Sequence, residues 1–405
     1  MRSEAAPPAV SRAAPLPLLR EQRISAGERW IFSAGFNVGP GLPDTTRIDC
    51  EVPDLLRLVG AGARVAVLAH QGSHRDGTAR SLEYVAAHLG RVLGHEVGYH
   101  PGSTGDGAVE RARGLRDGEV VLFGNTRQHA GEEADDPELA RQFALLGDRV
   151  AVGGFSKAHR VNASNTGILR HRPGWAADSL LTETEALAPW AGRAPGTRSL
   201  AVLGGVKPEK TLIGLRRLTE TYDVVVPGGV VLNTLLRVLG HEIGRSEMGQ
   251  SPGKCAEAAT RVLSGCRAEI HLPERLVVRG PDGAARTVDL ADGVPSDCAI
   301  VDFELPARTR ESLRRLREHG GRALMAGTPC RWTDGFGAAA RPLLDAFAAP
   351  AVRALLLGGD TVAELPWDGP VSGGGGSALQ YLADGTCAVF DALRSQHSTE
   401  RTTTP

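Results

Sequence analysis

Short apolar runs alternate with segments of helical spacing along most of this 405-residue chain. In the first half, apolar runs such as Arg64–Leu68 and Arg149–Val152 have strand length, and segments such as Ser81–Leu93 between them have helix length. This alternation predicts a parallel, doubly wound sheet, in which ligands bind beyond the carboxyl ends of the strands. The other strands expected in this half are Trp30–Val38 (with its turn), Val97–Tyr99 and Glu119–Phe123.

The alternation pauses at one long helical segment and then begins again. Ala177–Ala191, bounded by Pro173 and Pro195, reads as a helix that connects two domains. A chain of this length is too long for one ordinary core, so we expect two α/β domains, each a doubly wound, Rossmann-like parallel sheet. The strands expected in the second half are Leu200–Leu203, Val224–Val226, Ala299–Val301, Arg322–Met325 and Ala354–Leu357.

The expected boundaries follow from these elements. The N-terminal domain covers residues 26–175, the connector helix and linker residues 176–196, and the C-terminal domain residues 197–387. Residues 1–25 are rich in Ala, Pro and Arg, and we expect a disordered tail there because Pro and Arg interrupt the apolar stretch of a signal peptide. A transit peptide is the alternative. Residues 388–405 are expected to form a C-terminal tail.

Composition excludes several classes of protein. A net charge of −1 gives no field for holding nucleic acid, and no apolar run approaches membrane-spanning length. The 6 cysteines are scattered without a C-x-x-C pair, so neither a zinc site nor a disulfide framework is supported. Isolated thiols are typical of the reducing cytoplasm, which is the expected location.

Three arginines follow successive strands of the N-terminal half. Arg47, Arg127 and Arg160, with His70 and His159, would form a basic rim suited to carboxylate and phosphate oxygens. A single such arginine is more simply explained as solvated or ion-paired, but three after successive strands favour a site. Each histidine is explained nearly as well by bonds to backbone carbonyls.

The centre of the chain carries a strand, two glycines, two lysines and a helix in that order. Gly204 and Gly205 end the apolar run, Lys207 and Lys210 follow, and Thr211–Leu218 reads as a helix. Backbone N–H groups at a helix start, with a lysine beside them, suit phosphate, although the G-x-x-x-x-G-K-[ST] motif is absent. Alone, this stretch is more simply an ordinary turn with solvated lysines.

Two glycine-rich stretches lie near the C-terminus. Gly358-Gly359-Asp360-Thr361 follows a strand, and a carboxylate there suits Mg²⁺ bound jointly with nucleotide phosphates. Consecutive glycine N–H groups in Ser372–Ser377, before the helix expected at Ala378–Leu382, can hold a phosphoryl group. A flexible linker is the alternative, disfavoured by apolar segments on both sides.

Eight motifs then occur in an order that matches one known family. They are Phe36-Asn37-Val38, Thr46-Arg47-Ile48, His70-x-Gly72, Asn125-x-Arg127-x-His129, Ala158-His159-Arg160, Gly204-Gly205-x-Lys207, Gly358-Gly359-Asp360-Thr361 and Gly373–Gly376. On these motifs, residues 29–385 resemble the phosphoglycerate kinases. The resemblance implies an enzyme that uses ATP/ADP and Mg²⁺ with a phospho- or phosphonocarboxylate, and a monomer as the default.

The resemblance also implies roles for individual residues. It assigns substrate binding to Asn37, Arg47, His70, Arg127, His159 and Arg160. It assigns nucleotide binding to Gly204, Gly205, Lys207, Lys210, Gly228, Gly229, Pro329, Asp334, Gly358, Gly359, Asp360 and Thr361, with Asp360 also the metal ligand. It assigns catalysis to Arg47, Lys207, Gly374 and Gly375.

The implied chemistry needs no general base, because a carboxylate is already ionised at neutral pH. It needs positioning of the reactants and neutralisation of charge on the transferred group, which cations and backbone N–H groups supply. Since the two ligands would bind to different domains, closure about the connector is expected to bring them together.

The chain departs from the family pattern mainly where ligands would be contacted. Gly35 replaces an aspartate that contacts the C2 hydroxyl of the substrate, and Gly153 and Lys157 lie in a changed N-D-A-F-G-T motif. Lys207 and Lys210 are three apart instead of four, and Asp334 stands where a ribose-binding Glu is usual. The remaining departures are Ser73, Asn162 and Gly327.

These departures favour a divergent paralogue that phosphorylates the carboxylate of a phosphorylated or phosphonate carboxylic acid. Ordinary 3-phosphoglycerate kinase activity is the first alternative. A nucleotide-binding or scaffolding protein without turnover is the second, disfavoured by the retained Lys207, Asp360 and glycine run.

Overall fold

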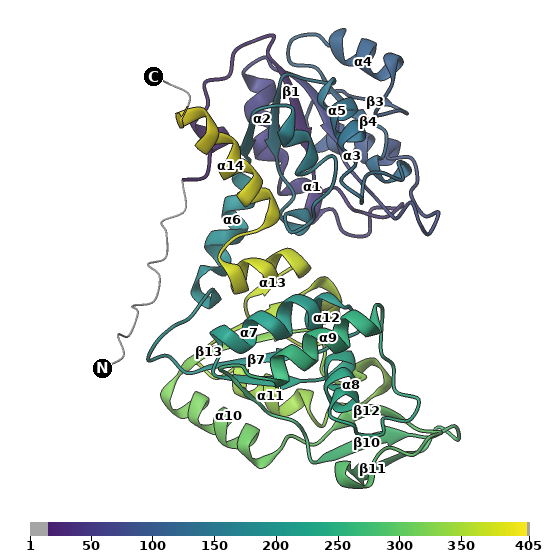
Figure 1. The fold of residues 1–405 in the computed structure, drawn as a ribbon. Helices are drawn as coiled ribbons and strands as arrows, with labels where there is room; N and C mark the ends of the chain where they lie inside the picture. Colours follow the sequence, from purple (N-terminus) through teal and green to yellow (C-terminus); the bar gives the residue numbers. More distant parts are fainter. Residues whose placement is uncertain (1–14, 403–405) are drawn as a thin grey trace. The chain divides into compact units, whose positions relative to one another are not determined.

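The computed structural model describes residues 15–402, with side chains through residue 397 (Figure 1). Within that range the chain divides into two compact units. Unit 1 takes the chain up to Thr182 and again from Ala388, and unit 2 is Glu183–Cys387. The chain thus leaves unit 1 once and returns to it for its last helix.

Unit 1 is built on a six-stranded sheet in which every pairing is parallel. The spatial order is β3-β4-β2-β1-β5-β6, so the central strands β1 and β2 come first in the sequence. The strands are β1 (Arg29–Ser33), β2 (Arg64–Leu68), β3 (Val97–His100), β4 (Val120–Phe123), β5 (Arg149–Val152) and β6 (Gly174–Ala176). The helices of its N-terminal segment are α1 (Thr46–Asp49), α2 (Val52–Gly60), α3 (Glu83–Leu93), α4 (Asp106–Arg113) and α5 (Pro137–Ala144).

The first and last described segments of the chain both pack on unit 1, contrary to part of the sequence-based expectation. Residues 1–14 of the expected N-terminal tail lie outside the described residues, but Leu19 is fully buried and Leu18 bridges to Ala176. In place of the expected C-terminal tail there is a helix, α14 (Ala388–Thr402). Its Gln396 accepts a hydrogen bond from Gly174 N at 3.0 Å. The apolar spacing of this helix is weak in the sequence, and the helix contacts a strand from which the bonded residues Gly174 and Gln396 are 222 positions apart. The local pattern therefore could not reveal the helix.

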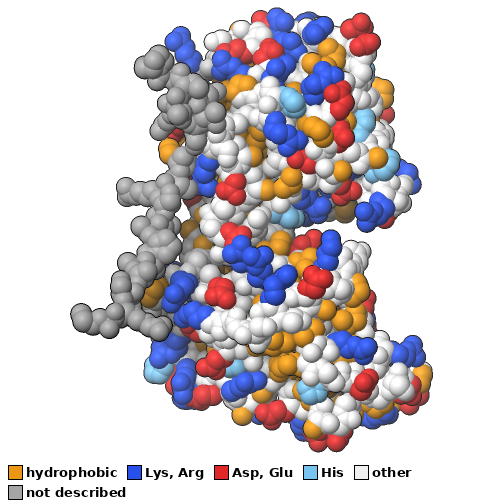
Figure 2. All heavy atoms as spheres, viewed as in Figure 1, with side chains coloured by type: hydrophobic (Ala, Val, Ile, Leu, Met, Phe, Trp, Pro, Cys, Tyr) orange, Lys and Arg blue, Asp and Glu red, His pale blue; other side chains and the backbone are white. Residues whose placement is uncertain are grey.

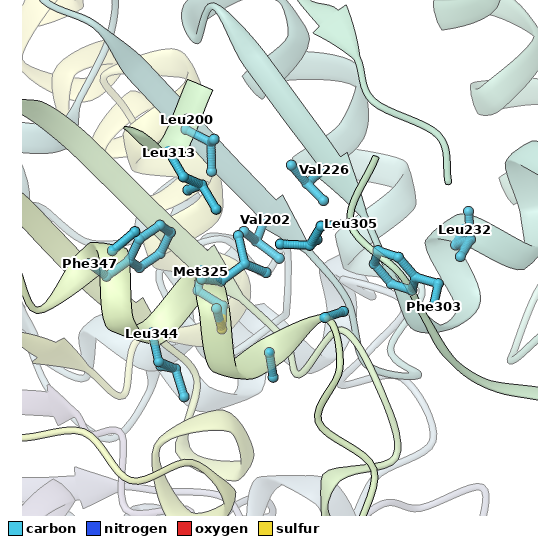
Figure 3. Packing of buried hydrophobic residues seen from close by; sticks show 14 of the residues in the cluster. Leu200, Val202, Val226, Leu232, Phe303, Leu305, Leu313, Met325, Leu344 and Phe347 are labelled. Atoms are coloured by element: carbon cyan, nitrogen blue, oxygen red, sulfur yellow. The ribbon is translucent and has the colours of Figure 1, made fainter. Parts of the chain in front are cut away.

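Unit 2 contains a second six-stranded parallel sheet, in the order β15-β14-β13-β7-β8-β9. Figure 3 shows its core, in which Val202 of β7 and Met325 of β13 lie among side chains from the helices, such as Leu313 and Phe347. The strands are β7 (Ser199–Leu203), β8 (Val224–Pro227), β9 (Glu269–Ile270), β13 (Gly321–Ala326), β14 (Val352–Leu357) and β15 (Val371–Ser372). The helices are α7 (Arg216–Thr221), α8 (Gly229–Val238), α9 (Pro252–Leu263), α10 (Ala307–His319), α11 (Ala340–Phe347), α12 (Gly359–Glu364) and α13 (Gly375–Asp384).

Unit 2 also carries a small antiparallel sheet that the sequence analysis did not foresee. It has the order β11-β10-β12, formed by Ala285–Asp289, Arg275–Arg279 and Ala299–Phe303. The expected strand Ala299–Val301 therefore exists, but in this sheet and not in the parallel one. The two α/β sheets themselves confirm the predicted fold class.

The connector is a shorter helix than expected. Helix α6 (Asp178–Leu187) is followed by a 3-10 turn, Ala188–Trp190, in which Pro189 lacks the N–H that an α-helix would need. The Asp54 carboxylate of α2 accepts hydrogen bonds from Asp178 N and Ser179 N, at 2.7 and 3.1 Å, and so caps the helix start. Ala176, expected in the connector, instead ends β6 in the unit 1 sheet.

Acidic and basic side chains are interspersed on the face of each unit drawn in Figure 2. None of the helices between residues 15 and 402 is both long and apolar enough to span a bilayer.

Candidate active site

The carboxyl ends of β1, β2, β4 and β5 bring four of the predicted basic residues together in unit 1. His70, which is 7% exposed, has its pKa lowered well below the ordinary value by burial, and then by the positive charges of Arg127, Lys157, Arg160 and Arg47. His70 is therefore a neutral imidazole among cations. We call Arg47, His70, Arg127 and Arg160 the arginine site.

Arg127 is held by the residues that surround the end of β4. The Asn125 side chain accepts hydrogen bonds from Arg127 N and Gln71 N, at 3.0 and 3.1 Å, and so ties the end of β4 to the end of β2. The guanidinium donates from Nη1 to Glu133 Oε1 at 2.5 Å, whereas its buried Nε has no partner among the described residues. An anionic ligand would compete with Glu133 for this arginine.

The other predicted substrate residues are more open. Arg47 on α1 is half-buried and donates from Nη1 to the Asn37 carbonyl oxygen at 3.2 Å, which places Asn37, an exposed residue, beside it. His159 and Arg160 are half-buried in the segment after β5. The structure thus brings the sequence-predicted residues of unit 1 to one edge of the sheet, while their roles stay a prediction.

A buried cluster of ionisable side chains beneath this edge was missed by the sequence analysis. Glu51, 1% exposed, accepts a hydrogen bond from Gly35 N at 2.9 Å through Oε1, while its buried Oε2 has no partner in the described range. Lys157, 4% exposed, donates to Ser33 Oγ at 2.7 Å and to Asn165 Oδ1 at 2.8 Å. The sequence contains one indication of this cluster: Lys157 lies in the motif that differs from the N-D-A-F-G-T pattern of the family.

Gly35 and Gly153 have no side chains, and this leaves the space that the buried cluster occupies. A Cβ at Gly153 would lie 2.2 Å from Glu51 Oε2, and a Cβ at Gly35 would lie 2.5 Å from the Cα of Gly154. No side chain fits at residue 35 unless the backbone of the neighbouring loop moves. The Gly35→Asp substitution, which would restore the residue expected from the family resemblance, is therefore not tolerated in this backbone.

The predicted nucleotide residues of unit 2 form a set of loops in backbone-to-backbone contact. Gly205 N donates to Thr328 O at 2.8 Å, and Gly229 N donates to Pro329 O at 3.0 Å. A Cβ at Gly327, where φ is +97°, would lie 2.1 Å from Gly204 O, and one at Gly228 would lie 2.5 Å from Pro329. We call these loops, Gly204–Gly205, Gly228–Gly229 and Gly327–Pro329, the glycine site.

Two lysines and one aspartate lie beside the end of β14. Lys207 Nζ and Asp360 Oδ2 form an ion pair at 2.6 Å, with side chains 62% and 72% exposed. Lys210 is buried, and burial, followed by the charge of Lys207, lowers its pKa to about 8. A Cβ at Gly358 would lie 3.9 Å from Lys210 Nζ. Gly358 and the three charged residues therefore lie close together at the end of β14.

The neighbourhood of Lys210 and Asp360 has two further features. The segment after Lys207, expected as one helix, is a π-helical turn, Lys210–Leu215, continued by α7. Thr361, predicted from the same motif, is buried in α12 and its backbone oxygen accepts Leu365 N.

The glycine run Gly373–Gly376 leads directly into a helix. Gly374 N donates to Ser372 Oγ at 3.1 Å, and α13 begins at Gly375, three residues earlier than expected. Glycine is a poor helix former, so residue type alone placed the start too late. The run therefore offers helix-terminal N–H groups, as predicted for holding an anion.

Two further contacts in unit 2 concern predicted or missed residues. Asp334, the expected ribose-binding residue, is paired with Arg279 of the antiparallel sheet at 2.9 Å. Thr328 Oγ1 donates to Glu364 Oε2 at 2.5 Å, which links the glycine site to the end of α12. The sequence analysis did not identify Arg279 or Glu364, because the residues that they contact, Asp334 and Thr328, are distant along the chain.

The donor set fits a magnesium ion shared with a nucleotide. Among the described residues there is no group of three His, Cys, Asp or Glu side chains that could hold a metal alone. Asp360 supplies one exposed carboxylate, and Mg²⁺ bound with nucleotide phosphates requires only one or two.

Comparisons with known proteins agree with this arrangement. The sequence profile of the phosphoglycerate kinase family matches residues 28–385. A phosphoglycerate kinase of Methylorubrum extorquens is 32% identical over 391 residues, covering 91% of this chain and 96% of the relative. One of Rhodospirillum centenum is 34% identical over 361 residues, covering 84% and 89%.

Solved structures show the same fold. Phosphoglycerate kinase from Pyrococcus horikoshii has a TM-score of 0.73 at 23% identity, covering 95% of this chain and 100% of that one. The structure from Coxiella burnetii has a TM-score of 0.69 at 24% identity, covering 94% and 100%.

The chain is therefore an α/β kinase with two parallel-sheet units. It belongs to the phosphoglycerate kinase family. This confirms the family resemblance and, at the level of the family, an ATP-dependent kinase with a carboxyl group as acceptor.

Proposed function

We propose that this protein transfers the γ-phosphoryl group of ATP to the carboxylate of 3-phosphoglycerate, giving an acyl phosphate and ADP. The comparisons favour this ordinary activity over the more divergent one that the sequence departures first indicated. The observation that carries the proposal is the arginine site, because three guanidinium groups around a neutral imidazole suit an acid with both a phosphate and a carboxylate.

In unit 1 the arginine site would bind and orient the acid. Arg127 and Arg160 present planar N–H donors, and neutral His70 can donate one hydrogen bond without adding charge. Arg47, on α1 and half-buried, donates from Nη1 to a backbone oxygen, a bond that it can exchange in order to turn toward the transferring group. Holding the carboxylate at reacting distance supplies most of the catalysis, since the nucleophile is already ionised.

In unit 2 the glycine site would bind ATP through backbone groups. Lys207 and the N–H groups of Gly374 and Gly375 would neutralise charge on the transferring phosphoryl. Asp360 would hold Mg²⁺, which neutralises phosphate charge when it is bound. The Lys207–Asp360 pair places the cation and the metal ligand at one point, so each can meet the same phosphates.

The second candidate for the acceptor is an acid related to 3-phosphoglycerate. The lack of side chains at Gly35 and Gly153 favours it. Neither residue has a side chain to offer a substrate, and the carboxylate of Glu51 occupies the space beside Gly153. A site that does not pair a hydroxyl accepts analogues that lack one. A phosphorylated or phosphonate carboxylic acid unsubstituted at C2 would then be used as well as 3-phosphoglycerate or better.

One assay separates these candidates. ADP release is measured with ATP, Mg²⁺ and a panel of 3-phosphoglycerate, its analogue without the C2 hydroxyl, and phosphonocarboxylates. The highest kcat/KM on 3-phosphoglycerate supports the main proposal, and a higher value on the analogue supports the second. ATP binding without turnover of any acid contradicts both and leaves a nucleotide-binding protein. Monomeric state and a cytoplasmic location, which the isolated thiols favour, complete the proposal.

A further inference from the structure

Lys157 is a buried cation that no expected role explains. It ends the 3-10 turn Phe155–Lys157 that follows β5, and its ammonium is bonded to Ser33 at the end of β1 and to Asn165. A buried lysine costs free energy unless it is hydrogen-bonded and compensated by charge. Two of its three N–H groups are used, and the carboxyl groups of Glu51 and Glu132 partly offset the effect of burial, which lowers its pKa to about 8.

One arm of this network runs from Lys157 toward Arg160. The Asn165 side chain accepts from Lys157 Nζ and donates its two N–H groups to Lys157 O and Arg160 O, at 3.1 and 2.7 Å. Asn165 is 1% exposed, so these bonds are made away from water. The backbone that carries Arg160 is therefore fixed by an amide whose orientation Lys157 sets.

A second arm runs toward Arg127. Ser33 Oγ accepts from Lys157 and donates to Ser164 O at 2.7 Å. Ser164 donates from N and Oγ to the buried carboxylate of Glu132, which also accepts from Thr126 Oγ1 at 3.1 Å. Thr126 precedes Arg127, so one continuous buried chain of bonds links the backbones of both arginines to the Lys157 ammonium.

The glycines explain why a long side chain is needed here. Gly35 and Gly154 meet backbone to backbone, and a Cβ on Gly154 would lie 3.0 Å from Lys157 Cε. Gly153 has no side chain with which to join the two loops, and Glu51 fills the space on its side. Lys157 reaches past these glycines from its own turn to the end of β1.

We propose that Lys157 is a positioning residue of the arginine site, which holds Arg160 in place through Asn165 and supports Arg127 through Ser33, Ser164 and Glu132. This inference rests on the proposed function, because it assigns Lys157 a role in binding the acid. Lys157 itself is too buried to contact a substrate.

The test uses the full-length protein, ATP, Mg²⁺ and 3-phosphoglycerate as the probe. Lys157→Met is expected to raise KM for 3-phosphoglycerate about tenfold, the scale of one misplaced charge-assisted contact, with KM for ATP unchanged. Amides 158–162 are expected to exchange hydrogen faster in the same variant without ligand. Lys254→Met, an exposed lysine on α9, is the matched control and should change none of these.

Two further variants separate positioning from general stability. Asn165→Ala removes the amide that joins Lys157 to the Arg160 backbone and leaves the bond from Lys157 to Ser33 in place. It should reproduce the rise in KM, which covers the case in which Lys157→Met does not fold. The double variant Lys157→Met with Arg160→Met should have no higher KM than Arg160→Met alone, because both act on one contact. Independent, multiplying effects would overturn the inference, as would an unchanged KM in folded Lys157→Met.

Failure of the proposed function gives a different result. If the wild type neither binds nor turns over 3-phosphoglycerate, that function is wrong, and amide exchange then decides the inference alone. Faster exchange at residues 158–162 in Lys157→Met supports positioning, and unchanged exchange overturns it.

Discussion

The arginine site of unit 1 and the glycine site of unit 2 are held together by different kinds of contact. In unit 1 the site depends on buried charged side chains, with Arg127, Lys157 and Glu132 all less than 5% exposed. In unit 2 the loops meet through backbone atoms, and the charged side chains Lys207 and Asp360 stand in solvent.

The chain departs from its family pattern in both units, and the two sites accommodate these departures differently. A buried side-chain network can exchange one set of charges for another if all partners change together, as Gly35, Gly153 and Lys157 indicate for unit 1. In unit 2, where Gly327 is itself a departure, any Cβ at Gly327 or Gly228 meets main-chain atoms in the present backbone. We therefore expect the network of unit 1 to accept further coordinated substitutions more readily than the glycine loops of unit 2.

The largest effect is expected at an exposed residue of unit 2. Asp360→Ala should lower Mg²⁺-dependent turnover about a hundredfold or more, the scale of losing one charge-stabilising group at the reacting centre. Tm should not change, because the side chain is 72% exposed and packs on no core. Steady-state kinetics and thermal melts measure both, with exposed Asp368→Ala as control. Normal turnover in Asp360→Ala would remove this residue from the mechanism.

The backbone contact predicts the next effect. Gly327→Ala should destabilise unit 2 by roughly 2–4 kcal/mol and abolish ATP binding, because a Cβ would meet Gly204 O and φ is +97°. Gly265→Ala, with nothing within 4 Å of its Cβ, is the matched control and should be nearly neutral. Urea unfolding and calorimetric ATP titration test this. Intact ATP binding in Gly327→Ala would show that the loops are not held by backbone contact.

Much of the fold could be predicted from the sequence because buried parallel strands are continuous apolar runs. Arg64–Leu68 and Arg149–Val152 were expected with the bounds that β2 and β5 have. The strands β6, β9 and β15 were missed because two or three residues are too few to give an apolar run. In the antiparallel sheet, β10 was missed because it is only partly buried and has an arginine at each end, and β11 was missed because it is mostly exposed. The start of β12 was expected as a strand, but not in this sheet.

Some residues of the candidate site could likewise be predicted from the sequence, and others could not. Arg47, Arg127, Arg160, Lys207 and Asp360 could be named because each follows a strand or a glycine turn at a predictable edge. Glu51, Lys157 and Glu132 could not, because nothing in a single sequence tells a buried charge from a solvated one. Their burial depends on contacts such as that between Glu51 and Gly35, sixteen residues apart.

A double-mutant cycle tests whether Glu51 and Gly153 share one space. Gly153→Ala alone should destabilise unit 1 by about 1–3 kcal/mol, because its Cβ would lie 2.2 Å from Glu51 Oε2. In Glu51→Ala the same change should cost much less, so the two effects should not add. Gly39→Ala, with open space around its Cβ, is the control. Additive free energies of unfolding would mean that the glycine is not there to accommodate the carboxylate.

The last prediction is a pH dependence that distinguishes the two buried groups of unit 1. Burial raises the pKa of Glu51 from 4.5 to about 8, against the hydrogen bond from Gly35 and the charge of Lys157, with Asp54 adding to the rise. The folded state therefore keeps a proton that the unfolded chain has released between pH 4.5 and 8. Unfolding then releases a proton, and stability falls as pH rises through this window.

Glu51→Gln cannot titrate, so comparison with the wild type isolates this group. The wild type should lose stability relative to Glu51→Gln between pH 5 and 8, with a slope of at most about 1.4 kcal/mol per pH unit. Lys157, whose pKa is lowered from 10.5 to about 8, acts with the opposite sign, and its contribution makes stability rise only between pH 8 and 10.5. The free energy of unfolding from urea melts at each pH measures both windows. If the difference in free energy of unfolding between the wild type and Glu51→Gln does not vary with pH below pH 8, Glu51 is ionised throughout this range. Glu51 and Lys157 then form a charged pair beneath the arginine site.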